Sequence, residues 1–506
     1  MGFLTIAISL LFVQYWFRDL IGAWKKAGDL DTFLASEKFY ETLWFAILVI
    51  LPLLYVNLST FGRSLDTGGD ETLYVISVLL SFAISLMWYQ YLTWLDIFEH
   101  ERLIFIFWTF LMSCATIFLV YPMTDAIEQS LNFELNGSFW NDWWYCVIAI
   151  GLVEEIVKII PFLIILKFTD QVDEPFDYIL YGSVSALGFA FIENIQYIYG
   201  SNLTAVYGRA LYASVAHMFF TSVICYGMAI AKHRNYAWKN YALPIFLTFA
   251  ALGHGFYDFW LINQIAQQFY LITTLFLLFC IHLWVTMKNN LINISSFFDR
   301  TVRLNSSSFK YKIILGLVAI FNVAYIAYFL LYGKSAANHF LLQSWLFNVY
   351  MVLYLAVSFE NFKLIQGYIA PIQMPKNIMA FLIPKIGQSE NYIGETIYVT
   401  CDPNDDAGLE SFQQSLPVSG VLVRRIVLKG DTSWYVFIPN SPIYAFEVVD
   451  RMFLVKLKKK GTMLNRSDFV GLEFVGLSQV QDFADGVVSK EAAVSLPQVR
   501  GKIINP

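Results

Sequence analysis

Eleven stretches of predominantly apolar residues, most of them about 20 residues long, recur along this 506-residue chain and constrain its fold more than any other feature. A helix needs about 20 apolar residues to cross the hydrocarbon core of a bilayer. The stretches lie near residues 2–17, 40–60, 72–96, 101–122, 143–167, 178–200, 206–231, 241–262, 266–287, 312–332 and 338–360. The sequence therefore predicts a polytopic α-helical membrane protein with about eleven transmembrane helices.

Charged residues are scarce in the part of the chain that holds these stretches. Residues 1–360 contain 43 Asp, Glu, Lys and Arg residues, whereas the much shorter segment 361–506 contains 29. The first part has too few charges to cover a water-facing surface, which excludes a soluble multidomain enzyme. The net charge of −6, without any basic block, excludes binding to nucleic acid.

The lysines and arginines between the stretches predict the orientation. Cytoplasmic loops of membrane proteins carry an excess of these residues. One alternate set of loops holds fourteen of them, and the other set holds two, Arg63 and Lys334. We therefore expect a multi-pass protein of the cell membrane, with the N-terminus outside and the C-terminus in the cytoplasm.

The pattern changes after residue 360. Pro371, Pro375 and Pro384 mark a linker, and short runs rich in β-branched and aromatic residues follow at 395–400, 420–428, 433–439 and 451–457. Such runs, separated by turn residues, predict a small C-terminal β-rich soluble domain. Because it contains no phosphate-binding loop and no metal-ligand cluster, we expect it to bind a cytoplasmic regulator.

These features predict five parts of the chain. They are 1–142 (transmembrane helices 1–4 and an extracytoplasmic loop), 143–262 (a four-helix membrane core that carries the catalytic residues), 263–360 (transmembrane helices 9–11), 361–385 (the linker) and 386–506 (the cytoplasmic β-rich domain).

Ionisable side chains lie inside four consecutive apolar stretches, where each costs at least about 2.5–3.5 kcal/mol on insertion scales. They are Glu154, Glu155 and Lys158, then Glu193, then His217, and finally His254 and Asp258. An ion pair between Glu154 and Lys158, four residues apart, explains only two of these groups. We interpret the remainder as a functional cluster. The predicted orientation puts five of the ionisable residues in the outer half of the membrane: Glu154, Glu193, His217, His254 and Asp258.

The order of these residues resembles the PrsW family of intramembrane proteases, which is related to the CAAX-prenyl endoprotease superfamily. The motifs are Glu154-Glu155-x-x-Lys158, Phe189-x-x-x-Glu193-Asn194, His217 in a span rich in small residues, and His254-x-x-x-Asp258. Asp177 and Arg209 also fit the local pattern of the family. The resemblance covers about residues 143–262 and implies proteolysis of a membrane-tethered regulator, such as an anti-sigma factor.

Two arrangements for peptide hydrolysis are open at this point. In the first, Glu154 or Glu155 acts as the general base on water, His254 orients that water, and His217 or Asn194 stabilises the oxyanion. In the second, His217, His254 and one or both of Glu193 and Asp258 bind a divalent metal such as zinc, and Glu154 or Glu155 takes the proton of the bound water. Lys158 keeps a glutamate ionised in both arrangements.

We predict an intramembrane endopeptidase, of the glutamic or metallo type, that cuts a membrane-anchored protein near the extracytoplasmic side of the lipid bilayer. Two other classes of protein also place acids and histidines inside a membrane. One is an ion- or proton-coupled transporter, and the other is a non-catalytic scaffold that binds membrane clients.

Overall fold

A computed structural model of the protein describes residues 14, 16–25, 27–58, 70–298, 306–362, 364 and 367–372, together with eight strand segments between 396 and 504. The chain divides into two units. The first comprises residues 1–287, 306–361 and 372–386, and the second comprises residues 288–305, 362–371 and 387–506.

Helices make up nearly all of the described part of the first unit. They are α2 (Leu30–Leu34), α3 (Glu37–Leu58), α4 (Asp70–Leu95), α5 (Leu103–Thr116), η1 (Ile117–Leu119), α6 (Val120–Leu131), α7 (Phe139–Tyr145), η2 (Cys146–Leu152), α8 (Val153–Phe168), α9 (Pro175–Gly200), α10 (Val206–Gly208), η3 (Arg209–Ala213), α11 (Ser214–His233), η4 (Lys239–Tyr241), α12 (Ala242–Ile262), η5 (Ala266–Phe269), α13 (Leu271–Asn293), α14 (Ser306–Tyr332) and α15 (Lys334–Phe359). The segments η2 and η3 are π-helical, and each runs directly into the α-helix that follows it.

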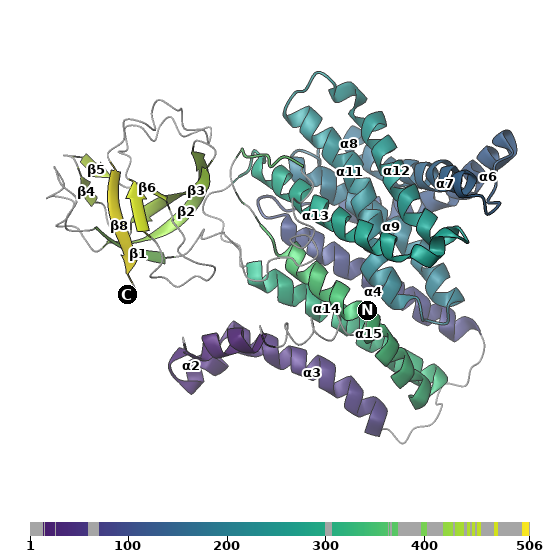
Figure 1. Ribbon diagram of the computed structural model, residues 1–506, viewed down its shortest axis with the longest axis horizontal. Helices are drawn as coiled ribbons and strands as arrows, with labels where there is room; N and C mark the ends of the chain where they lie inside the picture. The colour runs from purple at the N-terminus through teal and green to yellow at the C-terminus, as the bar shows by residue number, and fades with distance from the viewer. Residues whose placement is uncertain are drawn as a thin grey trace. The chain divides into compact units, whose positions relative to one another are not determined.

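Helices α9 and α11 form the centre of this unit (Figure 1). Helix α9 packs against α4, α5, α8 and α11, and α11 also packs against α12. In both α9 and α11, 89% of the most apolar 18-residue stretch is buried inside the protein. These two helices are therefore shielded by their neighbours, and the polar side chains that they carry face protein.

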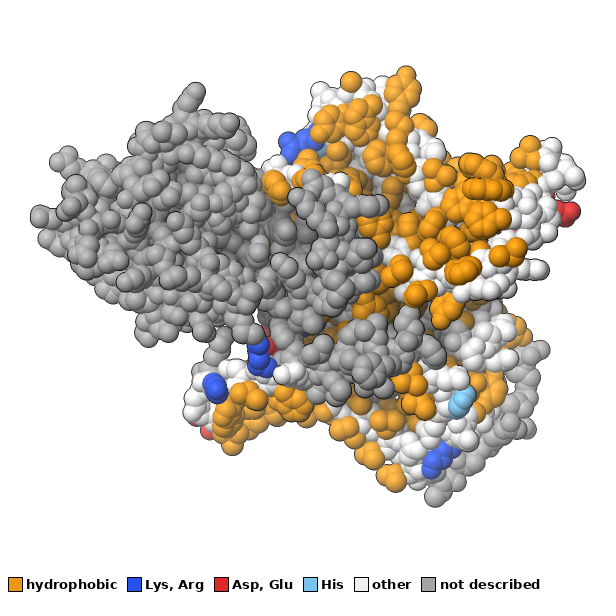
Figure 2. All heavy atoms as spheres, in the orientation of Figure 1, with side chains coloured by type: hydrophobic (Ala, Val, Ile, Leu, Met, Phe, Trp, Pro, Cys, Tyr) orange, Lys and Arg blue, Asp and Glu red, His pale blue; other side chains and the backbone are white. Residues whose placement is uncertain are grey.

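The outer helices expose apolar side chains instead. Trp44, Leu79, Phe107, Trp140 and Phe168 are each about half exposed or more, and hydrophobic side chains cover much of the visible helical surface (Figure 2). A soluble monomer rarely exposes such large apolar patches. This surface fits hydrocarbon, as expected for a multi-pass membrane protein.

The predicted number of eleven spans is wrong. Among the described residues, eight helices are long and apolar enough to cross a membrane: Glu37–Leu58, Glu71–Leu95, Leu103–Leu131, Pro175–Gly200, Val206–His233, Lys239–Ile262, Leu271–Asn293 and Ser308–Tyr332. A ninth is reached if Lys334–Leu346 and Asn348–Phe359, which are bent by 50° relative to each other, count as one span. The predicted span 2–17 lies almost wholly outside the described residues. The predicted span 143–167 is helical, but Glu154, Glu155 and Lys158 make it too charged to qualify by composition.

After residue 395 the described residues are strand segments. They are β1 (Thr396–Cys401), β2 (Val418–Leu428), β3 (Asp431–Pro439), β4 (Ile443–Ala445), β5 (Val448–Asp450), β6 (Phe453–Lys456), β7 (Val470–Glu473) and β8 (Gln498–Ile504). Their backbones pair antiparallel in the order β6-β3-β2-β1-β8-β7, with β4 and β5 as a separate pair.

The predicted β-rich soluble domain is not supported by these segments. A domain needs a packed hydrophobic core in addition to paired strands, and the described residues establish the pairing alone. The fold class is therefore corrected to a polytopic helical membrane protein with eight candidate spans, or nine with the bent pair.

Two glycines hold η2 close to α12 and thereby bring α8 near that helix. A Cβ atom at Gly151 would lie 2.6 Å from the carbonyl oxygen of Ala251 and 3.0 Å from the backbone nitrogen of Gly255. A Cβ atom at Gly255 would lie 2.5 Å from Cα of Val147. Both are backbone contacts, which leave no flexible side chain to move aside. The close approach of these two elements therefore requires glycine on both sides.

We expect Gly151→Ala to destabilise the protein by about 1–3 kcal/mol, because the added methyl group forces η2 away from α12. The unfolding midpoint of the purified protein in detergent measures this change. Gly200→Ala is the matched control, since nothing lies within 4 Å of a Cβ atom at that position. Equal midpoints for both variants would contradict the close packing of η2 on α12.

Candidate functional site

Helix α8 carries the first three predicted site residues on one face, because residues three and four apart project from the same side of a helix. Lys158 Nζ lies 2.9 Å from Glu154 Oε2 and 3.0 Å from Glu155 Oε1. It also lies 2.8 Å from His217 Nδ1 of α11. An ammonium group has three N–H donors, so each of them finds an acceptor although Lys158 is fully buried.

Helix α12 contributes His254 and Asp258, one turn apart. His254 Nδ1 lies 2.9 Å from Glu155 Oε1, and its Nε2 lies 3.3 Å from Asp258 Oδ2 and 3.6 Å from Glu154 Oε2. The imidazole also stacks on Phe220, with ring centroids 5.0 Å apart. The ring is therefore fixed at both nitrogens and on one face.

The motif on α9 surrounds Lys158 and His217 from another side. The ring of Phe189 lies 4.4 Å from Lys158 Nζ, which is a cation–π contact. Glu193 Oε2 lies 2.7 Å from His217 Nε2 and 2.7 Å from Arg209 Nη2. Arg209 Nε also donates to Asn194 Oδ1, and Asn194 Nδ2 donates to Ser214 Oγ at 3.2 Å.

Seven of the eight predicted site residues thus form one contact network, which we call the charged cluster: Glu154, Glu155, Lys158, Glu193, His217, His254 and Asp258. The eighth, Asn194, is joined to it through Arg209. Four helices, α8, α9, α11 and α12, contribute to the charged cluster, as the four consecutive motifs predict.

The carboxylates of the charged cluster differ in exposure. The side chains of Glu154, Glu193 and Asp258 are 14%, 20% and 19% exposed, whereas Glu155 is fully buried. Both oxygens of Glu155 are occupied, since Oε1 contacts Lys158 and His254 and Oε2 accepts from Thr221. Water therefore reaches Glu154 more readily than Glu155.

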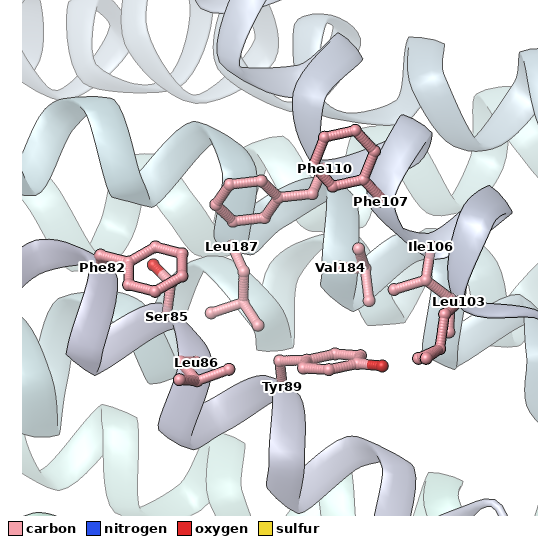
Figure 3. A pocket seen from close by; sticks show the side chains of 10 residues that line it. All are labelled: Phe82, Ser85, Leu86, Tyr89, Leu103, Ile106, Phe107, Phe110, Val184 and Leu187. Atoms are coloured by element: carbon pink, nitrogen blue, oxygen red, sulfur yellow. The ribbon is translucent and has the colours of Figure 1, made fainter.

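A separate apolar pocket of about 260 Å³ lies between α4, α5 and α9 (Figure 3). Its lining is almost wholly hydrocarbon and includes no residue of the charged cluster. The pocket is thus distinct from the polar site.

Comparison with known proteins supports the family resemblance. Residues 101–285 match the model of the PrsW family, described as intramembrane metalloproteases. Protease PrsW of Geobacillus kaustophilus is 30% identical over 202 residues, which cover 39% of this chain and 84% of that protein. Protease PrsW of Bacillus subtilis is 28% identical over 187 residues, covering 37% of this chain and 81% of that protein. No solved structure matches.

The chain belongs to the PrsW family. The matched region begins just before α5 and ends within α13, and it contains every residue of the charged cluster. It is also longer than the 143–262 segment in which the motifs occur. Helices α3, α4, α14 and α15 and all of the strand segments lie outside it.

The family description as metalloproteases raises the question of whether these side chains fit a metal. Glu154, His217 and His254 each offer a donor atom, and these atoms all lie within 4.8 Å of one another. Two imidazoles and one carboxylate are a donor set that zinc accepts in catalytic sites. The carboxylate of Glu155 holds His254 at Nδ1, as is common for metal-binding histidines, and Nε2 of the same ring faces Glu154 and Asp258. The side chains therefore fit a divalent ion.

The predicted ligand set was Glu193, His217, His254 and Asp258. The group within 4.8 Å shares the two histidines with that set but takes Glu154 as its carboxylate. Glu193 and Asp258 each contact one of the histidines instead. An ion would also share ligands with Lys158, which contacts both Glu154 and His217.

Three residues that sequence reasoning gave no role support the charged cluster. Thr221 Oγ1 donates to Glu155 Oε2 at 2.8 Å, and Ser185 Oγ donates to the carbonyl oxygen of Lys158 at 2.5 Å. Arg209, noted only as part of the family pattern, pairs with Glu193. The i,i+4 spacing of Thr221 from His217 is a signal in the sequence, but hydroxyl groups at such positions are too common to single it out.

The π-helical segments were also not foreseen. Segment η2 ends at Leu152, two residues before Glu154, and η3 begins at Arg209 and ends four residues before His217. Single π-helical turns are rare and frequently occur at functional sites, because the extra residue re-aims the side chains that follow.

We expect Thr221→Val to destabilise the protein by about 1–3 kcal/mol, because the isosteric change leaves a buried carboxylate oxygen of Glu155 without its donor. Thr221→Ser should restore most of the loss. Thermal unfolding in detergent measures both variants. Thr248→Val is the control, since the hydroxyl of Thr248 lies on an exposed side chain and bonds only within its own helix. A wild-type midpoint for Thr221→Val would rule out this supporting role.

Proposed function

We propose that this chain is an intramembrane endopeptidase that hydrolyses a peptide bond of a membrane-anchored protein at the charged cluster. The observation that carries this proposal is the placement of Glu154. This partly exposed carboxylate lies 2.9 Å from a buried ammonium and 3.6 Å from an imidazole nitrogen. Family membership supports the same reaction and favours neither a transporter nor a scaffold.

Peptide hydrolysis needs a base for water, a donor for the oxyanion and an acid for the leaving amine. We assign the base to Glu154, because it is the glutamate of α8 that water reaches. His254, whose Nε2 faces both Glu154 and Asp258, is placed to pass a proton to the leaving amine. We assign the oxyanion donor to His217. Its Nδ1 accepts from Lys158, so the ring proton is on Nε2 and faces Glu193 Oε2 at 2.7 Å, and this N–H would turn from Glu193 to the oxyanion of a bound substrate.

Glu155 and Lys158 are positioning residues in this scheme. Both are fully buried. Glu155 fixes the tautomer and orientation of His254, and Lys158 holds the two glutamates and His217 together.

Glu154, His217 and His254 would hold the metal that the family description implies. A divalent ion bound there would lower the pKa of a bound water and polarise the substrate carbonyl. Glu155 would then fix the orientation of the His254 imidazole through Nδ1, and Glu193 would fix that of His217 through Nε2.

The predicted orientation places the cut near the extracytoplasmic end of the substrate. Along α9, Glu193 precedes the C-terminal residue Gly200 by seven residues, or about 10 Å. To test this, the protein is reconstituted in proteoliposomes with single-span test proteins, and the position of any cut is mapped. The assay shows both whether cleavage occurs and where. A cut at the cytoplasmic boundary would contradict the orientation, and binding without any cut would favour a scaffold.

We expect Glu154→Gln to lower the rate of cleavage by about 10²–10⁴-fold, the usual contribution of a general base, and to leave the unfolding midpoint near that of the wild type. Glu155→Gln should lower both the rate and the midpoint, because it removes a buried charge on which Lys158 and His254 depend. Glu134→Gln, on an exposed side chain, is the matched control. Unchanged cleavage by both Glu154→Gln and Glu155→Gln would refute the assignment.

Elemental analysis of the purified protein measures how much metal each chain binds, and this measurement does not depend on activity. We expect about one zinc per chain in the wild type and its loss in a His217→Ala/His254→Ala double variant. Lys158→Met should keep the zinc, because it removes the cation that shares those ligands. If chelated protein without metal retains full cleavage, the glutamate alone activates water.

A further inference from the structure

A second group of acidic residues lies at the opposite end of α9 from Glu193. Asp96 directly follows α4, Glu101 precedes α5, Asp173 and Glu174 precede α9, and Asp177 lies in the first turn of α9. We call these five residues the acidic cluster. Asp177 and Glu193 are 16 residues apart on α9, or about 24 Å, so the acidic cluster is separate from the charged cluster.

The carboxylate oxygens of the acidic cluster are spaced as ligands of one ion. Oxygens from Asp96, Glu174 and Asp177 all lie within 4.8 Å of one another, and so do oxygens from Glu101, Asp173 and Asp177. Two oxygens that bind the same Ca²⁺ at about 2.4 Å can be at most about 4.8 Å apart. Asp177 is the one residue that belongs to both groups.

Two members have a buried oxygen that nothing satisfies. The side chains of Asp96 and Asp177 are 3% and 0% exposed. Asp96 Oδ2 accepts from the backbone N–H of Glu101, and Asp177 Oδ2 accepts from those of Asp173 and Glu174. The other oxygen of each, Oδ1, has no hydrogen-bond partner. A buried carboxylate oxygen without a partner is costly, and a bound cation would offset this cost.

No lysine or arginine within the described ranges forms an ion pair with Asp96 or Asp177. The nearest cationic group to Asp96 is His100, at 4.0 Å and with a side chain that is mostly exposed. Asp96 and Asp177 therefore have no lysine or arginine as a counter-charge in the described part of the chain.

We propose that the acidic cluster binds one hard divalent cation, Ca²⁺ or Mg²⁺, through Asp96, Glu174 and Asp177, with Glu101 and Asp173 as neighbouring carboxylates. Both ions prefer carboxylate oxygens. The bound ion ties the α4–α5 connection to the α8–α9 connection and so fixes the end of α9 that is remote from Glu193. This site is independent of the proposed proteolysis.

Chelator-treated full-length protein in detergent is titrated with CaCl₂ or MgCl₂ by calorimetry and thermal unfolding. We expect one ion per chain and an unfolding midpoint that rises with ion concentration, since a ligand of the folded state stabilises it. The preferred ion is the one that binds more tightly. Asp96→Asn/Asp177→Asn should weaken binding at least tenfold.

Two controls separate this site from other charges. Asp125→Asn/Glu134→Gln removes the same charge from exposed side chains and should bind as the wild type does. His217→Ala/His254→Ala should also retain full binding, because it alters only the charged cluster. Absence of binding at millimolar ion, or equal affinity of the Asp96→Asn/Asp177→Asn variant and the wild type, overturns the proposal.

A spectroscopic measurement on the wild type covers the case in which the double variant does not fold. Tyr181 donates to Glu101 Oε2 at 2.5 Å, so Tb³⁺ in the acidic cluster should emit when tyrosine is excited. Ca²⁺ or Mg²⁺ should displace this emission, whereas emission that neither ion displaces would also overturn the proposal.

Discussion

The ammonium of Lys158 is a full positive charge buried among helices that otherwise pack apolar side chains. A buried charge is tolerated only when it is paired and hydrogen-bonded. Its three acceptors come from α8 and α11, so the relative position of these helices is set to within a hydrogen-bond length. Because Glu155 also contacts His254, the same constraint extends to α12. One cation thus specifies how three helices meet.

The site could be predicted largely from the sequence because helical spacing is regular. Residues three and four apart share a face, and antiparallel spans bring motifs of similar depth together. The ionisable residues inside four consecutive apolar stretches gave the seven members of the charged cluster, and their catalytic roles stay a prediction. The sequence left open which glutamate faces water, since Glu154 and Glu155 are adjacent and differ only in what surrounds them. Thr221, which engages Glu155 from another helix, accounts for much of that difference.

The number of spans, the C-terminal strands and the acidic cluster could be predicted less well from the sequence. The stretch 143–167 was counted as a span because it is mostly apolar. The helix found there, α8, is not among the candidate spans, because Glu154, Glu155 and Lys158 give it too many charges. The sequence predicted one span at 338–360, where the structure has two helical parts that are bent by 50° relative to each other. After residue 395, alternating β-branched residues indicated strands, but alternation cannot show whether strands enclose a core. The acidic cluster was missed because its members lie in two regions about 75 residues apart, the α4–α5 connection and the start of α9 with the residues before it.

The charged face of α8 has a consequence for the synthesis of the protein. Each charge near the bilayer centre opposes lateral release of a helix from the insertion channel. Lys158 can pair with Glu154 and Glu155 as soon as α8 forms. Its partner His217 is 59 residues further along the chain, and His254, the partner of Glu155, is 99 residues beyond Glu155. The ribosome must therefore extend the chain through α9, α11 and α12 before α8 has all of its partners. We therefore expect this segment to enter lipid together with the later helices that supply its partners, at a time set by the order of translation.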